Sequence, residues 1–171
     1  IDLTGSTVEK FEKAVEEGVV EPLENKNPIP EGFRHEYTFE NFVVGSSNKF
    51  AHAASMAVAN KDYSSYQNDN IYNPLFIYGP SGVGKTHLLY AITNKLAKRY
   101  PSKKIVYIKG EEFTNQLVEA IRNKTTFEFR EKFRRVDVLL IDDIQFVAGR
   151  DSTQLEVFNT FNAVYEERKQ I

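Results

Sequence analysis

Short, unbroken apolar runs alternate along the chain with longer segments in which apolar residues recur at helical spacing. Three of the runs are typical of buried strands, and they lie at 73–78, 104–108 and 138–141. Helical spacing predicts five helices, over about 46–60, 86–97, 112–122, 126–133 and 153–169. Strands that alternate with helices in this way predict a three-layer α/β fold built on a parallel sheet.

The sequence defines two of these helices more closely. Ser46 or Ser47 is a suitable N-terminal cap for the helix that ends near residue 60, whose apolar positions are Ala53, Met56 and Ala57. The helix that begins near residue 86 has one apolar face, formed by Leu88, Leu89, Ile92, Leu96 and Ala97. We expect both helices to pack through these positions.

Charge and composition divide the chain near residue 31. Residues 1–31 hold eight acidic and three basic residues together with Pro22, Pro28 and Pro30, a composition typical of a flexible acidic linker. Residues 32–171 hold 16 acidic and 19 basic residues, so the net charge of −2 conceals a mildly basic remainder. With 41% hydrophobic residues in the chain, this remainder is large enough to form one domain with its own core.

Composition also excludes several classes of protein. The chain has no cysteine, which excludes disulfides and thiolate metal sites. No apolar run approaches the roughly 18 residues that a membrane span requires, and no segment has the pattern of a secretion signal. The three histidines are far apart in sequence and lack metal-ligand spacing. We therefore expect a soluble protein of the cytoplasm.

Residues 79–86 read Gly-Pro-Ser-Gly-Val-Gly-Lys-Thr and match the phosphate-binding loop pattern G-x-x-x-x-G-K-[ST]. A predicted strand precedes the loop and a predicted helix follows it, which is the context that this motif requires. Backbone N–H groups of such a loop surround an anion, and the amino end of the helix favours negative charge. We expect Lys85 to contact the β and γ phosphates of a nucleotide and Thr86 to place its hydroxyl on Mg²⁺.

Two carboxylates, Asp142 and Asp143, follow the last predicted strand. The four apolar residues of 138–141 suit a parallel strand that is covered on both faces. Open α/β sheets bind ligands at the carboxyl ends of their strands, which makes Asp142 a candidate for the magnesium shell of the same nucleotide site. Without the glycine loop upstream, the pair would be interpreted as a solvated turn.

The segment 122–135 combines basic and aromatic residues. Its basic side chains outnumber Glu128 and Glu131, and they are Arg122, Lys124, Arg130, Lys132, Arg134 and Arg135. Interleaved with them are three aromatic residues, Phe127, Phe129 and Phe133. Such a mixture suits single-stranded nucleic acid, because the charges track phosphates and the rings stack on bases. Phenylalanines at helical spacing can equally face a core while the charges are solvated, and the pattern leaves both interpretations open.

Five stretches resemble the AAA+ domain of the DnaA family of bacterial chromosomal replication initiators, and they are residues 37–48, 73–79, 84–89, 136–146 and 153–162. The Asp-Asp-Ile-Gln-Phe run at 142–146 is more specific to this family than the phosphate loop. The resemblance spans about residues 36–171. It implies a three-layer P-loop NTPase of the AAA+ class with a parallel sheet, of which this chain holds the N-terminal portion.

The resemblance implies an ATP-dependent initiator of DNA replication. Family members bind ATP with Mg²⁺, assemble head to tail at the replication origin, melt an AT-rich duplex and help to load the replicative helicase. The implied partners are origin DNA, single-stranded DNA, further copies of the protein, and the helicase or its loader. Asp143 stands where many AAA+ proteins have a catalytic Glu, and its shorter reach toward the attacking water implies a slow, regulatory ATPase.

The same resemblance assigns roles to individual residues. Nucleotide contacts are implied for Phe42, Val43, Val44, Gly45, Gly79, Gly82, Val83, Gly84, Lys85, Thr86 and His87. Magnesium is assigned to Thr86 and Asp142, and catalysis to Asp142 and Asp143. The helix pair 112–135 is similar to the family insertion that lines a channel for single-stranded DNA, and the implied DNA contacts are Val118, Arg122, Lys124, Arg150 and Thr153.

Two departures from the family pattern affect these expectations. Pro80 and Ser81 replace the more usual loop residues, but both positions are variable, so nucleotide binding should survive. The chain also ends at Ile171, where the next strand of the family begins, between the glycine-loop strand and the Asp142 strand. We therefore expect residues 1–171 alone to be loosely folded or aggregation-prone, to bind ATP weakly and to form no ATP-dependent oligomer.

Three other functions are compatible with parts of the sequence. A helicase loader or an initiator regulator would share the AAA+ core, and a helix-turn-helix domain beyond residue 171 would favour the initiator. A nucleotide kinase would share the phosphate loop, which is also similar to that of guanylate kinases, but it would lack a strand ending in Asp-Asp. A protein that binds ATP as a structural ligand would fail a single-turnover hydrolysis assay.

Overall fold

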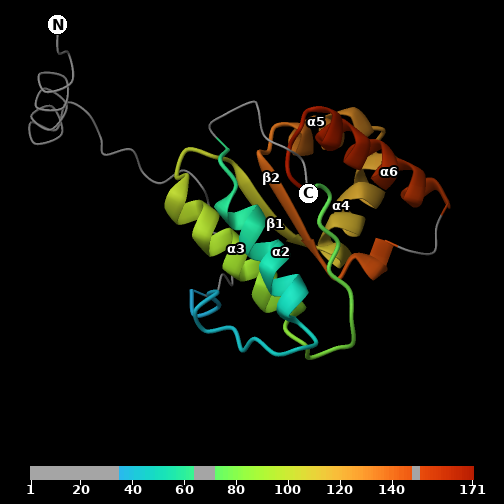
Figure 1. The fold of residues 1–171 in the computed structure, drawn as a ribbon. Helices are drawn as coiled ribbons and strands as arrows, with labels where there is room; N and C mark the ends of the chain where they lie inside the picture. The colour runs from blue at the N-terminus through green and yellow to red at the C-terminus, as the bar shows by residue number, and fades with distance from the viewer. Residues whose placement is uncertain (1–34, 64–71, 148–150) are drawn as a thin grey trace, which may run out of the picture.

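The computed structural model describes residues 35–63, 72–147 and 151–171 (Figure 1). The predicted linker and the predicted DNA contact Arg150 lie outside these residues. The elements are helices α2 (Lys49–Asn60) and α3 (Lys85–Arg99), strand β1 (Ile105–Lys109), helices α4 (Gly110–Arg122) and α5 (Thr126–Arg134), strand β2 (Val138–Asp142), the 3-10 helix η1 (Ile144–Val147) and helix α6 (Asp151–Glu166). None of the helices in these ranges is long and apolar enough to cross a membrane.

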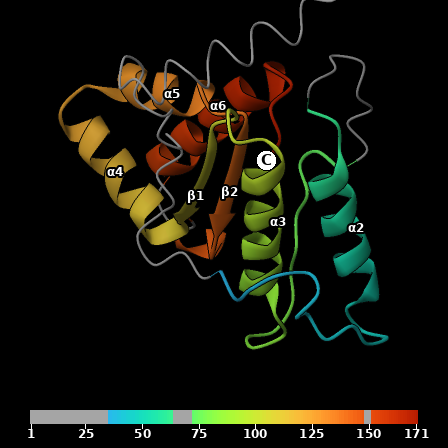
Figure 2. The ribbon, with the colours of Figure 1, turned by 90° about the vertical axis from the view of Figure 1, so that its left-hand side faces the viewer.

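Helices cover both faces of a parallel sheet and give the molecule three layers (Figure 2). Strands β1 and β2 pair from Ile105 beside Val138 to Lys109 beside Asp142. Helices α2 and α3 pack on one face, together with Ile105, Val138 and Leu140. Helix α4, with α5 and α6 beside it, covers the other face, together with Ile108 and Leu139. Alternate strand residues thus enter opposite cores, as expected for a strand buried on both faces, and the predicted three-layer α/β class is confirmed.

The last two residues of the chain lie along the free edge of β2. The Leu139 N–H donates to the Gln170 carbonyl at 2.8 Å, which makes Gln170 a parallel neighbour of β2. One residue later, the Ile171 carbonyl accepts a hydrogen bond of 2.9 Å from the Leu75 N–H. Residues 170–171 therefore lie between β2 and the segment that leads into the phosphate loop.

The predicted strand at 73–78 is wrong. A strand requires a ladder of backbone hydrogen bonds, and in this segment Leu75 is the only residue whose backbone N–H donates to another described part of the chain. The side chain of Asn73 fixes the segment instead, because its Oδ1 accepts the Ile171 N–H at 2.9 Å. Tyr78, at the end of the apolar run, is 83% exposed.

Helix α2 forms where the sequence predicts it but begins and packs differently. It begins at Lys49, with Asn48 in the capping position that was predicted for Ser46 or Ser47. Ala53 and Ala57 are exposed. The buried positions of α2 are Ala54, Ser55, Val58 and Ala59. The apolar pattern is weak here because alanine suits either face, and packing against α3 selects the face.

Helix α6 ends three residues before the predicted Lys169. The chain leaves the helix after Glu166, and Arg168 adopts a left-handed backbone conformation with φ of 57°. This turn brings Gln170 beside β2, where its side chain donates to the Tyr72 carbonyl at 2.7 Å. The other helices agree with the prediction within about three residues, the usual uncertainty of helix ends.

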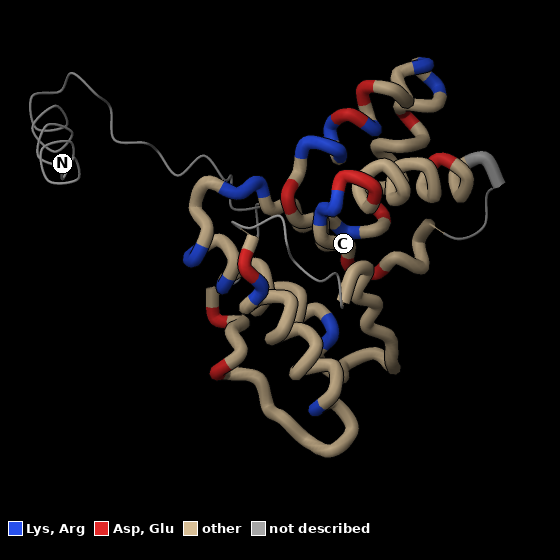
Figure 3. The backbone as a smooth tube through the Cα atoms, turned by 45° about the horizontal axis from the view of Figure 1, so that its top comes forward, with Lys and Arg blue, Asp and Glu red and all other residues tan. Residues whose placement is uncertain are grey.

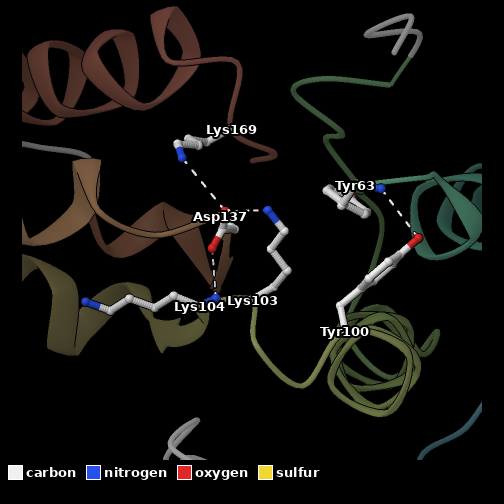
Figure 4. Close-up of polar contacts among 6 residues, drawn as sticks. All are labelled: Tyr63, Tyr100, Lys103, Lys104, Asp137 and Lys169. Carbon is white, nitrogen blue, oxygen red and sulfur yellow. Dashed lines mark hydrogen bonds and ion pairs between the residues drawn. The ribbon is translucent and has the colours of Figure 1, made fainter. Parts of the chain in front are cut away.

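Asp137 connects the elements at the amino end of the sheet (Figure 4). Its carboxylate accepts the backbone N–H of Lys104 at 2.9 Å and pairs with Lys103 Nζ at 3.3 Å. Lys169 Nζ lies 3.8 Å from Oδ1, the oxygen that Lys103 also contacts. These contacts hold together the starts of β1 and β2 and the segment that follows α6.

Candidate nucleotide-binding site and single-strand surface

The phosphate loop leads directly into the first turn of α3. Gly82 and Gly84 have φ of 81° and 95°, in a backbone region that other residues rarely adopt. Lys85 begins the helix, and its Nζ donates to the carbonyls of Gly79 at 2.9 Å and Pro80 at 2.8 Å. The ammonium group therefore lies against the loop. In Figure 2 the start of α3 lies at the same end of the molecule as the tips of β1 and β2.

The segment before α2 lies against the first turns of α3. His87 Nε2 lies 2.7 Å from the Thr38 carbonyl, so this predicted nucleotide contact binds the protein's own backbone. The Phe42 ring contacts two histidine rings, with centroid distances of 5.7 Å to His52 and 5.1 Å to His87. A Cβ at Gly84 would come within 2.7 Å of the Phe42 ring. Glycine at this position thus lets the segment touch the phosphate loop.

The four nucleotide contacts predicted at 42–45 divide into two kinds. Phe42 is 9% exposed and belongs to the core, whereas Val43 and Val44 are 85% and 50% exposed and are open to a ligand. The Gly45 N–H donates to Asn48 Oδ1 at 2.8 Å, and Asn48 Nδ2 donates to the Val43 carbonyl at 3.0 Å. Asn48 therefore shapes this loop. The prediction missed it, although asparagine directly before a helix is a recognised signal.

Asp142 is the last residue of β2 and is only 5% exposed. Its Oδ2 accepts the Tyr107 hydroxyl at 2.9 Å, and its Oδ1 accepts the Asp143 N–H at 3.0 Å. Burial, a hydrogen bond with Tyr90 and the charge of Asp142 raise the pKa of Tyr107 far above its usual value, so Tyr107 is a neutral donor. Within the described ranges no lysine or arginine pairs with Asp142.

Asp143 points away from the core and has a left-handed backbone with φ of 54°. Its Oδ1 accepts a hydrogen bond of 3.1 Å from Gln145 Nε2. The backbone at the start of α4 passes close to the backbone of Asp143, and a Cβ at Gly110 would clash with the Asp143 carbonyl. Gly110 is therefore needed for this close approach. The prediction overlooked it, although a glycine at the end of a predicted strand often marks a close backbone contact.

The available donors suit a magnesium ion that protein and nucleotide hold together. Across the described ranges, no three His, Cys, Asp or Glu side chains gather into a site of their own. Magnesium usually binds through one or two carboxylates, with phosphate oxygens and water completing its shell. Asp142 and the hydroxyl of Thr86, exposed in the first turn of α3, are the residues that would hold it.

Three of the five predicted DNA contacts line one pocket. Val118, Arg122 and Thr153 meet around a cavity of about 690 Å³ between α4, η1 and α6, which Thr114, Asn115, Glu119, Phe146 and Val147 complete. Thr153 is 2% exposed, so most of its surface is covered by protein. Lys124 does not line the cavity and lies in the turn after α4.

The basic segment 122–135 separates into paired and unpaired charges. Figure 3 shows basic residues interspersed with acidic ones in the part of the chain formed by α4, α5 and α6. Arg134 pairs with Glu167 at 2.7 Å. Neither Arg122 nor Lys124 forms an ion pair with a described residue. Phe129 and Phe133 are buried in the core, whereas Phe127 is 66% exposed.

The fold and the phosphate loop define a P-loop NTPase of the AAA+ class. A model of the bacterial DnaA ATPase domain family matches residues 33–171. The chain belongs to this family. Membership favours the replication initiator over the nucleotide kinase that shares the loop motif.

Individual relatives agree with this assignment. The chromosomal replication initiator protein DnaA of Thermus thermophilus is 48% identical over 177 residues, which cover 100% of this chain and 39% of the relative. The crystal structure of domain III from the Thermotoga maritima replication initiation protein DnaA superimposes with a TM-score of 0.72 at 46% identity, covering 81% of this chain and 55% of that one. A structure of replication initiator DnaA bound to AMPPCP and single-stranded DNA has a TM-score of 0.69 at 40% identity, covering 81% and 41%. The chain thus spans well under half of the Thermus thermophilus relative.

Proposed function

We propose that residues 32–171 are the ATP-binding domain of a DNA replication initiator and that residues 1–31 are a flexible linker. The observation that carries the proposal is the arrangement at the end of the sheet, where Lys85 lies against the phosphate loop and Asp142 ends β2 without a cationic partner in the described ranges. A related structure holds the ATP analogue AMPPCP. This supports ATP as the ligand of the site, and Mg²⁺ is proposed with it.

Each part of the site has a distinct task in nucleotide binding. Gly79, Gly82 and Gly84 let the backbone curve around the phosphates, and Lys85 exchanges its loop carbonyls for phosphate oxygens. Thr86 and Asp142 would hold the ion, which would neutralise phosphate charge. Val43, Val44 and Val83 are exposed apolar side chains near the loop and supply contacts for the base. Phe42, Gly45 and His87 hold these segments in place.

Hydrolysis is a second, slower task of the same site. Asp143 is exposed beside Asp142 and its carboxylate is the candidate base for the attacking water. Its side chain is one methylene shorter than glutamate and is held by Gln145, which limits its reach. We therefore expect a slow ATPase that works as a switch between ATP and ADP states.

A whole initiator of this family would use that switch at the replication origin. Family membership supports an initiator that assembles head to tail in its ATP state, melts an AT-rich duplex and helps to load the replicative helicase. Such a protein acts where the chromosome lies, in the cytoplasm. The DNA-bound relative supports a single-strand contact through this domain, with Val118, Arg122, Lys124, Arg150 and Thr153 as the contacting residues.

The nucleotide site is tested with Lys85→Ala in the complete protein. We expect ATP affinity to fall by about 100-fold or more, because a charge-assisted contact to phosphate is lost while the core is untouched. Lys98→Ala is the matched control, since Lys98 is an exposed lysine near the other end of α3. Fluorescent-nucleotide titration measures both. Equal affinity of the Lys85 variant and wild type would show that the phosphate loop does not bind the nucleotide.

A further inference from the structure

We propose that Tyr107 is a positioning residue that fixes the carboxylate of Asp142 for magnesium, and that Tyr90 in turn holds Tyr107. The three side chains come from three neighbouring elements, α3, β1 and β2, so they connect the phosphate-loop helix to the magnesium carboxylate. This inference deepens the proposed function of the same site and rests on it.

Asp142 is held by one donor at each oxygen. The Tyr107 hydroxyl donates to Oδ2 at 2.9 Å, and the Asp143 N–H donates to Oδ1 at 3.0 Å. The torsion that rotates a carboxylate is broad in the absence of such partners. Two donors on opposite oxygens therefore fix the plane of the group. Each carboxylate oxygen can accept more than one bond, so acceptor capacity remains for the ion or its water.

Tyr107 is in turn held by the helix that follows the phosphate loop. The Tyr90 ring of α3 stacks on the Tyr107 ring, with a centroid distance of 4.7 Å and an angle of 24° between their planes. Tyr90 is 9% exposed and Tyr107 is partly buried, so the Tyr90 side of the stack is covered by the protein. A shift of α3 would therefore move the hydroxyl that orients Asp142. This contact couples the two halves of the nucleotide site.

The chemistry of the donor favours a metal-positioning role over a purely structural one. A lysine or arginine beside Asp142 would stabilise the carboxylate but would also compete with a cation. The Tyr107 hydroxyl is neutral, so it orients the carboxylate and leaves its negative charge for Mg²⁺. Partners of metal ligands act in this way in many metal sites.

The test is Tyr107→Phe in the complete protein, which removes the hydroxyl and keeps the ring that stacks on Tyr90. ATP affinity is measured by fluorescent-nucleotide titration, first in EDTA and then across a series of Mg²⁺ concentrations. We expect affinity in EDTA to be unchanged and the Mg²⁺ concentration at half effect to rise by about 10-fold. Tyr63→Phe is the matched control, because it removes a hydroxyl that bonds the Val58 carbonyl in the last turn of α2.

A double-mutant cycle separates positioning from a general loss of stability. If Tyr107 acts through Asp142, the double variant should show the same dependence of ATP affinity on Mg²⁺ as Asp142→Asn alone. Additive losses, or an equal loss of affinity with and without Mg²⁺, would overturn the inference, and so would a wild-type magnesium response in Tyr107→Phe. If the ATP affinity of the wild-type protein did not depend on Mg²⁺, the proposed magnesium site itself would be wrong, and the inference with it.

Discussion

Strand β2 has an aspartate just before its start and another at its end, and the two have opposite surroundings. Asp137 accepts the Lys104 N–H and pairs with Lys103 and Lys169. Asp142 receives only the Tyr107 hydroxyl and a backbone N–H, and no cation pairs with it in the described ranges. The carboxylate that the protein neutralises supports the fold. The carboxylate that has no cationic partner in the described ranges is the one available to a ligand.

The difference follows from the free-energy cost of burying charge. A buried carboxylate without a cation is destabilising, because hydrogen bonds from neutral groups replace only part of its hydration. A bound cation would offset this cost at Asp142, whereas Asp137 needs none. Unneutralised groups of this kind are typical of functional sites, where stability is lower than the fold alone would allow.

The basic residues of α4, of the turn after it and of α5 show the same contrast between paired and unpaired charge. Arg134 is paired with Glu131 and Glu167, whereas Arg122 and Lys124 form no ion pair with a described residue. Arg122 also lines the pocket between α4, η1 and α6. Unpaired charge therefore marks a candidate binding position here as well.

The largest effect is expected when the negative charge is removed from the aspartate at one or the other end of β2. Asp142→Asn should weaken ATP affinity in Mg²⁺ by at least about 10-fold, because one ligand of the ion is lost. Its melting temperature in the absence of nucleotide should stay equal or rise, since an unneutralised buried charge is removed.

Asp137→Asn is the matched variant and should behave in the opposite way. ATP affinity should remain that of wild type, whereas the free energy of unfolding should fall by about 1 kcal/mol as two ion pairs are lost. Nucleotide titration and thermal unfolding measure both variants. If the two variants lost ATP affinity equally, the division of roles between the ends of β2 would be wrong.

An intermediate effect is expected at Arg122 and Lys124, two of the proposed contacts to single-stranded DNA. The double variant Arg122→Ala with Lys124→Ala should bind single-stranded DNA about 10-fold more weakly at low salt, and the slope of log affinity against log salt should shrink by about 1.4 for two lost phosphate contacts. ATP affinity should not change. Fluorescence anisotropy with a labelled oligonucleotide provides the measurement.

Arg134→Ala is the control for the Arg122 and Lys124 variant, because the Arg134 guanidinium is already paired within the protein. It should keep the wild-type salt slope. A double variant with an unchanged slope would mean that Arg122 and Lys124 are solvated charges without a role in DNA binding.

The smallest effect is expected at Lys169, the more distant of the two cations beside Asp137. Its Nζ lies 3.8 Å from the carboxylate, and both side chains are partly exposed to water. Lys169→Ala should therefore lower the free energy of unfolding by no more than about 0.5 kcal/mol. Denaturant unfolding measures this change, and a loss several times larger would show that the third contact of Asp137 is the dominant one.

Local patterns in the sequence were sufficient for most of the fold. The unbroken apolar run before Asp142 predicted β2, and the spacing of Leu88, Ile92 and Leu96 predicted the buried face of α3. The phosphate loop was identified from the order of its residues alone. These features depend on neighbours within one turn or one strand, so the sequence contains the information that forms them.

The predicted strand at 73–78 failed because a strand depends on its partners. The apolar run is present, but only Leu75 donates a backbone hydrogen bond to Ile171, about a hundred residues away in the sequence. The face of α2 was misassigned for a similar reason, since its alanines are compatible with either side and α3 selects one.

The sequence by itself determined the three-layer class, the phosphate loop and the identity of Asp142 as a candidate ligand. Only the tertiary structure decided which charges are neutralised. Asp137 and Asp142 look alike in the sequence, and their difference arises because Lys103 and Lys169 reach one end of β2 while Tyr107 and Gly110 reach the other. Contacts between residues far apart in the chain determine which charges are neutralised and where two backbone segments come close. A local sequence pattern does not contain this information.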